Sequence, residues 1–189
     1  MTFKKKEKKI FLITGGAGYI GSHLANLLLD NNYNVIVIDN LSRGRLELIP
    51  KKSIFFKCDI DDENQISKIL NRYRIDLVFH LAGYKDVTES NKFPKKYFIN
   101  NYYKSKKFID TCIKYNLKKI IFSSSASVYG NMEKREIREN DKVCPISVYG
   151  KTKLKFENYL IKNKKKNKLK YIILRYFNVA GSEKKLRSG

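Results

Sequence analysis

Residues 10–21, IFLITGGAGYIG, restrict the fold of this chain more than any other stretch. The first four are apolar, which is typical of a strand buried on both faces. Glycines then follow in a G-x-x-G-x-x-G spacing, at Gly15, Gly18 and Gly21, and apolar residues recur after them at helical spacing. A strand, a glycine turn and a helix N-terminus together form a cradle for phosphate groups, because the first turn of the helix offers free N–H groups and a positive dipole end.

An acidic residue follows where a dinucleotide needs one. Asp39 ends the next apolar run, 35–38, and lies 18 residues after Gly21. A carboxylate at this place accepts hydrogen bonds from the adenosine ribose of NAD and repels the 2′-phosphate of NADP, so we predict NAD as the cofactor. Arg43 and Arg45 lie close by in the sequence and are cations that could compensate for this repulsion.

Strand-like and helix-like segments alternate through the rest of the chain. Further strands are expected at 54–58, 77–81, 119–123 and 171–175, and further helices up to about residue 73, at 95–115 and at 148–163. This alternation predicts an α/β fold with a doubly wound parallel sheet, the Rossmann-like NAD-binding fold. We assign residues 1–175 to the NAD-binding domain and residues 176–189 to the start of a substrate-binding region.

Composition limits the other functions that the chain could have. The net charge is +22 at pH 7, but lysines are scattered through every segment, which favours a codon bias over specific binding of nucleic acid. The cysteines Cys58, Cys112 and Cys144 lie far apart without metal spacing, so we expect no metal site and a reducing, cytoplasmic location. No apolar run approaches the roughly 18 residues that a membrane helix needs, so no membrane partner is expected.

Tyr149 and Lys153 form a candidate acid–base pair. They lie four residues apart in an expected helix, so their side chains share one face. A lysine ammonium near a phenol stabilises the phenolate and lowers the pKa of the tyrosine. Such a tyrosine can take the proton of an alcohol while hydride leaves the same carbon, and a hydroxyl from the serine cluster at 123–127 can bond to the same oxygen. The Tyr-x-x-x-Lys spacing alone is weak, and the cofactor cradle gives it weight.

Several motifs resemble those of one protein family almost from end to end. They are GGAGYIGSH, DNLSRG, CDI, HLAGYKDVTES, the NN pair at 100 and 101, SSSASVYG, YGKTK and LRYFNVAG. The chain is similar to the extended short-chain dehydrogenases/reductases, and within them to the UDP-glucose 4-epimerases. Related 4,6-dehydratases carry an Asp-Glu pair where this chain has Ser125 and Ala126, which favours the epimerases.

The resemblance implies specific roles for residues of the glycine turn and the strand ends. It implies NAD contacts from Gly15, Gly18, Tyr19, Ile20, Gly21, Asp39, Asn40, Asp59, Ile60, Leu81, Ala82, Lys85, Asn100, Tyr149, Lys153 and Tyr176. It also implies catalytic roles for Ser125, Tyr149 and Lys153, and substrate contacts from Ser125, Tyr149 and Asn178. The implied reaction is NAD-dependent inversion at C4 of a UDP-sugar through a transient 4-keto sugar, and relatives often dimerise, so a homodimer is also implied.

Some positions depart from the family pattern. The family usually has proline where this chain has Val148 and Val179, and the loss of a fixed φ predicts looser loops there. Lys104 replaces a glycine and is expected to crowd the packing of its helix. The family also has a long C-terminal portion, so we interpret the chain as an N-terminal part with the substrate domain largely missing. We expect it to bind NAD, to epimerise poorly and to expose apolar surface around Phe177.

Other interpretations stay open at this point. The chain could be a catalytically silent NAD-binding module or another NAD-dependent nucleotide-sugar epimerase or dehydratase. A basic nucleic-acid binder is supported by charge alone. His23 and His80 are interpreted as packed residues rather than bases, and Cys144 as incidental.

Overall fold

Six parallel strands form a single sheet. The computed structural model describes residues 8–131, 136–182, 185 and 187. The strands are β1 (Ile10–Thr14), β2 (Asn34–Asp39), β3 (Ile54–Lys57), β4 (Leu77–His80), β5 (Lys119–Ser125) and β6 (Lys170–Tyr176). Their order is β3-β2-β1-β4-β5-β6, and each neighbouring pair is parallel. This confirms the predicted doubly wound sheet. From β1 the first three strands are added towards one edge of the sheet and the last three towards the other edge, so the direction of winding reverses between β1 and β4.

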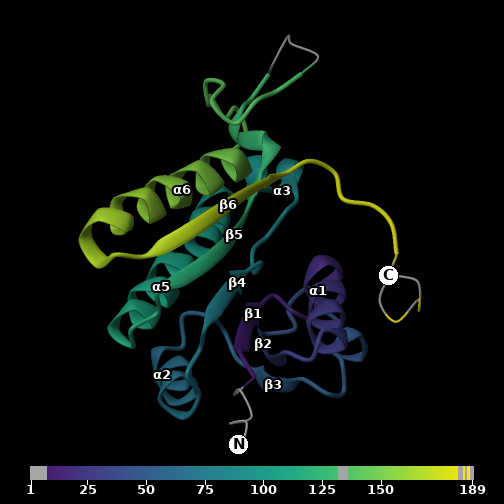
Figure 1. The fold of residues 1–189 in the computed structure, drawn as a ribbon. Helices are drawn as coiled ribbons and strands as arrows, with labels where there is room; N and C mark the ends of the chain where they lie inside the picture. The colour runs from purple at the N-terminus through teal and green to yellow at the C-terminus, as the bar shows by residue number, and fades with distance from the viewer. Residues whose placement is uncertain (1–7, 132–135, 183–184, 186, 188–189) are drawn as a thin grey trace, which may run out of the picture.

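Helices cover both faces of the sheet (Figure 1). They are α1 (Tyr19–Asp30), α2 (Glu63–Arg72), α3 (Val87–Lys92), α4 (Pro94–Phe98), α5 (Ser105–Lys114) and α6 (Val148–Asn167). Helix α1 packs on one face, and α2, α5 and α6 lie on the other.

Side chains that alternate between the two faces of the sheet divide the hydrophobic core into two clusters, one under α1 and one under α2, α5 and α6. Residues 35 and 37 of β2 pack towards α1 together with Phe11 and Ile13, while Leu12, Ile36 and Ile38 belong to the layer of α2, α5 and α6. Successive strand residues point to opposite faces, so a strand that is apolar at every position is buried on both sides. The near-continuous apolar runs of the sequence follow from this.

Two helical features differ from the sequence-based expectation. The expected helix at 95–115 is a continuous helical run, but its middle, Ile99–Lys104, is a π-helix between α4 and α5. Helix α3 was not expected, and it begins at a cap where the Asp86 carboxylate accepts the N–H of Glu89 at 2.7 Å. Asn101 belongs to this π-helical segment and is only 2% exposed.

The described residues hold neither a membrane-spanning helix nor a metal-ligand cluster. Over the ranges given above, no helix is both long and apolar enough to cross a bilayer. Within the same ranges, no three histidine, cysteine or acidic side chains gather as they would around a metal ion. Cys58, Cys112 and Cys144 are free thiols. The expected substrate-binding region at 176–189 is described only as far as residue 182, with 185 and 187, so residues 183–184, 186 and 188–189 lie outside the described part.

Candidate active site

One cleft collects the residues that the sequence singled out. It has a volume of about 980 Å³ and lies beyond the carboxyl ends of the strands, around the point where the winding reverses. Every residue assigned above to cofactor, substrate or catalysis lines this cleft. They come from segments as distant in sequence as Gly15 and Asn178. Parallel strands explain this gathering, because their carboxyl ends all meet at one edge of the sheet.

The glycine turn fits the phosphates of a dinucleotide. Gly15 has φ +73°, and a Cβ there would lie 2.7 Å from the backbone nitrogen of Ala82. A Cβ on Gly21 would lie 2.3 Å from the carbonyl oxygen of Gly15. Helix α1, which is described in full, has no acidic side chain in its first turn and no side-chain cap at Gly18. Its first N–H groups are therefore left for an anionic ligand.

Asp39 is held at the rim of this turn. One carboxylate oxygen accepts the N–H of Ala17 at 3.0 Å, and the other accepts the N–H of Leu41 at 2.8 Å. Both contacts come from backbone, so they fix the carboxylate between the glycine turn and the loop after β2. Acceptor capacity remains on both oxygens, and the binding of ribose hydroxyls by Asp39 stays a prediction.

The expected adenine end of the cleft carries an ion-pair cluster. The Lys104 ammonium lies 2.5 Å from one oxygen of Asp59 and 3.3 Å from Asp61, and Asn40 donates to Asp59 at 3.0 Å. Burial alone would raise the pKa of Asp59, but the Lys104 ammonium and the Asn40 amide outweigh it and hold this pKa below its usual value. Lys104 thus does not crowd the helix as expected, because its long side chain leaves the π-helical segment towards the two aspartates.

Ser125, Tyr149 and Lys153 meet at the other end of the cleft. Ser125 ends β5, and Tyr149 and Lys153 lie one turn apart at the start of α6. The Ser125 hydroxyl accepts the N–H of Ser127 at 3.1 Å and caps the 3₁₀ turn Ala126–Val128. The Lys153 ammonium donates to the carbonyl oxygen of Ser123 at 2.8 Å and lies 5.7 Å from the centre of the Tyr149 ring. Spacing along the helix therefore brought the side chains together as predicted.

The electrostatics of this pair differ from the prediction. Burial raises the pKa of Tyr149, and a hydrogen bond with Ser125 acts against that rise. Burial also lowers the pKa of Lys153 to about 8, with the Glu157 carboxylate opposing it. In this structure Lys153 bonds to a backbone carbonyl rather than to the phenol. The pKa of Tyr149 is thus raised by desolvation rather than lowered as predicted, with the Ser125 hydrogen bond as the opposing effect.

Helix α3 holds the start of α6, which the sequence did not reveal. The Ser90 hydroxyl accepts the N–H of Tyr149 at 3.1 Å, and the Asn91 side-chain carbonyl accepts the N–H of Val148 at 3.0 Å. A proline at position 148 would have no N–H to donate. Valine at position 148, where the family usually has proline, thus keeps an N–H that bonds to Asn91. This bond and the one from Tyr149 to Ser90 hold the start of α6 in place, contrary to the expected loosening.

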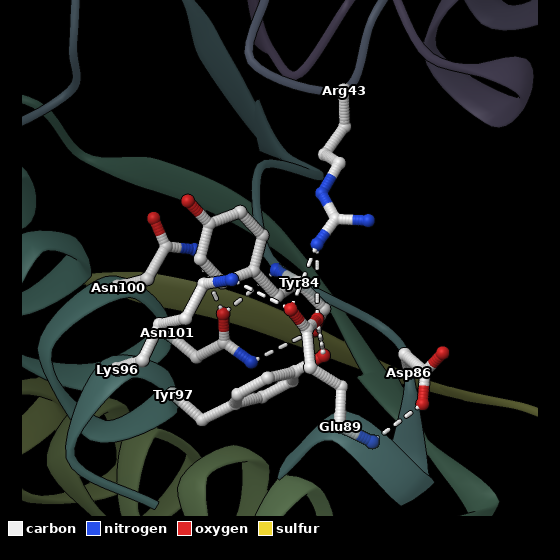
Figure 2. A network of polar contacts seen from close by, with 8 residues as sticks. All are labelled: Arg43, Tyr84, Asp86, Glu89, Lys96, Tyr97, Asn100 and Asn101. Atoms are coloured by element: carbon white, nitrogen blue, oxygen red, sulfur yellow. Dashed lines mark hydrogen bonds and ion pairs between the residues drawn. The ribbon is translucent and has the colours of Figure 1, made fainter. Parts of the chain in front are cut away.

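A second group missed by sequence reasoning surrounds Tyr84 (Figure 2). The Asn101 side chain accepts the N–H of Tyr84 at 2.8 Å and donates to its carbonyl at 2.9 Å. Asn100 in turn donates to Asn101 at 2.9 Å. These bonds fix the backbone next to Lys85, so Asn101 supports the cleft wall from behind. The NN pair in the sequence was a signal for this, although only Asn100 was assigned.

His80, interpreted as a packed residue rather than a base, is packed as expected. His80 is fully buried, hydrogen-bonds to Thr14 at 2.8 Å and stacks near Phe108 and Phe122. Burial lowers its pKa to about 3, so it stays neutral. Cys144 is exposed.

The end of β6 leads into an exposed stretch. Tyr176 and Asn178 line the cleft, and the neighbouring Phe177 and Val179 are 64% and 47% exposed. Further along, the Tyr19 hydroxyl donates to the carbonyl of Gly181. The segment after β6 thus runs from the catalytic end of the cleft towards α1 (Figure 1). The apolar surface expected around Phe177 is present.

Known proteins with similar sequences and structures are epimerases. Residues 11–188 match the NAD dependent epimerase/dehydratase family. The UDP-glucose 4-epimerase of Azospirillum brasilense is 40% identical over 178 residues, which cover 94% of this chain and 51% of that protein. The putative UDP-arabinose 4-epimerase 2 of Arabidopsis thaliana is 39% identical over 187 residues, covering 94% of this chain and 45% of that protein.

Solved structures agree with these matches. The UDP-glucose 4-epimerase from Brucella ovis in complex with NAD superimposes with a TM-score of 0.90 at 36% identity, over 93% of this chain and 54% of that one. The UDP-glucose 4-epimerase from Bifidobacterium longum in complex with NAD+ and UDP gives 0.91 at 33% identity, over 96% and 57%. The chain thus spans about half the length of the relatives it matches. By sequence and by fold, it belongs to the NAD-dependent epimerase/dehydratase family.

Proposed function

We propose that this chain binds NAD and supplies the acid–base residues for inversion at C4 of a UDP-sugar through a transient 4-keto sugar. The observation that carries the proposal is the shared cleft, in which Tyr149 and Lys153 face the same space as the glycine turn and Asp39. The names of the relatives, UDP-glucose and UDP-arabinose 4-epimerases, support a UDP-sugar as substrate.

The cleft residues divide into a binding end and a reacting end. Backbone N–H groups at the start of α1 would hold the pyrophosphate, Asp39 would hold the adenosine ribose, and Asp59 and Ile60 would border the adenine, since all of them line the cleft. Tyr176, which lines the same cleft, would lie beside the nicotinamide. Bound NAD would supply the hydride acceptor and donor for C4.

The acid–base work falls to Tyr149. In its phenolate form it would take the proton of the sugar 4-hydroxyl, become the phenol, and return the proton after the keto sugar has turned, while the Ser125 hydroxyl bonds to the same oxygen. Lys153, whose pKa burial lowers to about 8, lies one helical turn away. Asn178 would contact the phosphates of the UDP-sugar from the exposed segment after β6.

A homodimer is part of the same proposal. Ile99 and Tyr103 are 42% and 54% exposed on the π-helical segment. Large apolar side chains at the surface favour a protein interface. We place the dimer contact there.

The proposal is tested by replacing Tyr149 with phenylalanine. This chain is joined to the substrate-binding half of the Azospirillum brasilense relative, and conversion of UDP-galactose to UDP-glucose is followed with NAD present. We expect Tyr149→Phe to lower turnover by about 10²–10⁴-fold, the range for loss of a positioned acid–base group, while NAD affinity changes little. Turnover near that of the parent protein would rule out the assigned base, and Tyr171→Phe serves as the matched control away from the cleft.

A further inference from the structure

The chain carries features of both NAD-binding and NADP-binding sites. Asp39 at the end of β2 is the carboxylate that selects NAD, whereas a nearby arginine is the group that accommodates the 2′-phosphate of NADP. Arg43 is such an arginine, since it follows Asp39 by four residues and lines the same cleft. Side-chain acceptors pin the intervening loop, because Asn40 accepts the N–H of Ser42 at 2.9 Å. Whether the cleft favours NAD or NADP therefore depends on whether the Arg43 guanidinium can reach the 2′ position of the ribose.

The Arg43 guanidinium points across the cleft (Figure 2). Its terminal nitrogen donates to both oxygens of Glu89, at 3.1 and 3.0 Å. The guanidinium also lies over the ring of Tyr84, 5.4 Å from the ring centre. Glu89 belongs to α3 and Tyr84 to the loop after β4, so both lie on the opposite side of the point where the winding reverses.

Glu89 is a fixed and ionised partner. The Lys96 ammonium lies 2.6 Å from one of its oxygens, and the hydroxyl of the fully buried Tyr97 donates to the other at 2.8 Å. The Lys96 and Tyr97 contacts hold the pKa of Glu89 below its usual value. The carboxylate is therefore charged at neutral pH and ordered before any ligand enters.

Arg45 and Lys104 are less well placed than Arg43 to meet a 2′-phosphate. Arg45 is not among the residues that line the cleft. Lys104, at the adenine end, is paired with Asp59 and Asp61. Of the three cations nearest the ribose site in the sequence or at the adenine end, Arg43 is thus the one that lines the cleft and could meet a 2′-phosphate.

We propose that Glu89 is a specificity-determining residue, which draws the Arg43 guanidinium away from the ribose site and so makes the cleft selective for NAD. The 2′-phosphate of NADP then meets the Asp39 carboxylate without a counter-charge. This inference rests on the proposed function, in that the cleft must bind a dinucleotide. The effect is modest in size, because the Arg43 side chain is 61% exposed and exposed ion pairs are weak.

The test is a double-mutant cycle on the whole chain. Dissociation constants for NAD and for NADP are measured by calorimetry for the wild type, Glu89→Gln, Arg43→Met and the double variant. Glu89→Gln frees the guanidinium, so the Kd for NADP should fall about three- to tenfold while that for NAD stays within about twofold. Arg43→Met should leave NADP binding unchanged in the wild type and abolish the gain in the Glu89→Gln background.

A matched control and a second variant make the outcome decisive. Glu63, at the start of α2, forms an ion pair with Lys114 in the same way that Glu89 of α3 pairs with its cations, but Glu63 does not line the cleft. Glu63→Gln should therefore leave the dissociation constants for NAD and NADP unchanged. Glu89→Asp keeps the charge but shortens its reach, and it should shift NADP affinity in the same direction if Glu89→Gln does not fold. If NAD binds but these Glu89 variants leave NADP affinity unaltered, the inference is wrong and the proposed function stands. If the wild type binds neither dinucleotide, the proposed function itself fails.

Discussion

Lys153 is a cation enclosed by the core. It is only 5% exposed, its ammonium lies 5.0 Å from the centre of the Phe122 ring, and it donates to the carbonyl of Ser123. Burial lowers its pKa from 10.5 to about 8. Burial of the charged lysine therefore costs free energy of folding. A buried ionisable group with such a shifted pKa is typical of a functional site.

This free-energy cost predicts that Lys153→Met stabilises the folded chain by an amount that depends on pH. Between pH 8 and 10.5 the unfolded chain binds the lysine proton that the folded chain has lost, so wild-type stability rises with pH in this window. Below pH 8 the full cost is present, and the variant should be more stable by about 1–3 kcal/mol at pH 7. Urea unfolding at pH 7 and at pH 10 checks this, with Lys151→Met on the exposed side of α6 as control. A stability gap that is the same at both pH values would contradict the account.

The single-residue predictions succeeded where position alone decides. The spacing of Tyr149 and Lys153 on a helix correctly placed both side chains in one cleft. Their pKa values could not be predicted in the same way, because desolvation depends on the layers packed around them. The partner of Lys104 was missed for a related reason, since Asp59 lies 45 residues away in the sequence.

Helix α3 shows why short elements escape prediction. Its sequence, VTESNK, has six residues without apolar periodicity, and it is stabilised by the Asp86 cap and by contact with α6. The π-helical segment escaped for another reason, because one extra residue in a turn leaves the apolar pattern of the flanking helices intact. Long, strongly patterned strands and helices were predicted to within a few residues.

The contact between α3 and α6 makes a second testable prediction. Val148 is the first residue of α6, where proline is normally well tolerated, and the preceding Ser147 has ψ 152°. Val148→Pro should be nearly neutral in the wild type, because the entropy gain is offset by loss of the hydrogen bond to Asn91. In an Asn91→Ala background the same change should stabilise by about 0.5–1 kcal/mol in urea unfolding. Equal effects in both backgrounds would show that the Asn91 bond contributes nothing.

For the molecule as a whole, backbone topology could be predicted and side-chain pairing could not. Alternating strands and helices together with one glycine turn led to the six-stranded parallel sheet and to the edge at which ligands bind. Pairs such as Arg43 with Glu89 join a loop of one half of the sheet to a helix of the other half, so no local sequence pattern predicts them. Residues that occupy strand ends were therefore found from sequence, while residues that orient them were not.

The central claim is that the cleft at the glycine turn binds NAD, and a calorimetric titration of the chain tests it most directly. A Cβ on Gly18 would meet nothing nearer than the Gly15 carbonyl at 3.4 Å, so Gly18→Ala should fold normally, as thermal unfolding can verify. The added methyl group would stand where the pyrophosphate approaches the backbone. We predict saturable binding of one NAD per chain and binding about tenfold weaker in Gly18→Ala. Absence of saturable binding to the wild type, or equal affinity in the folded variant, would contradict the claim.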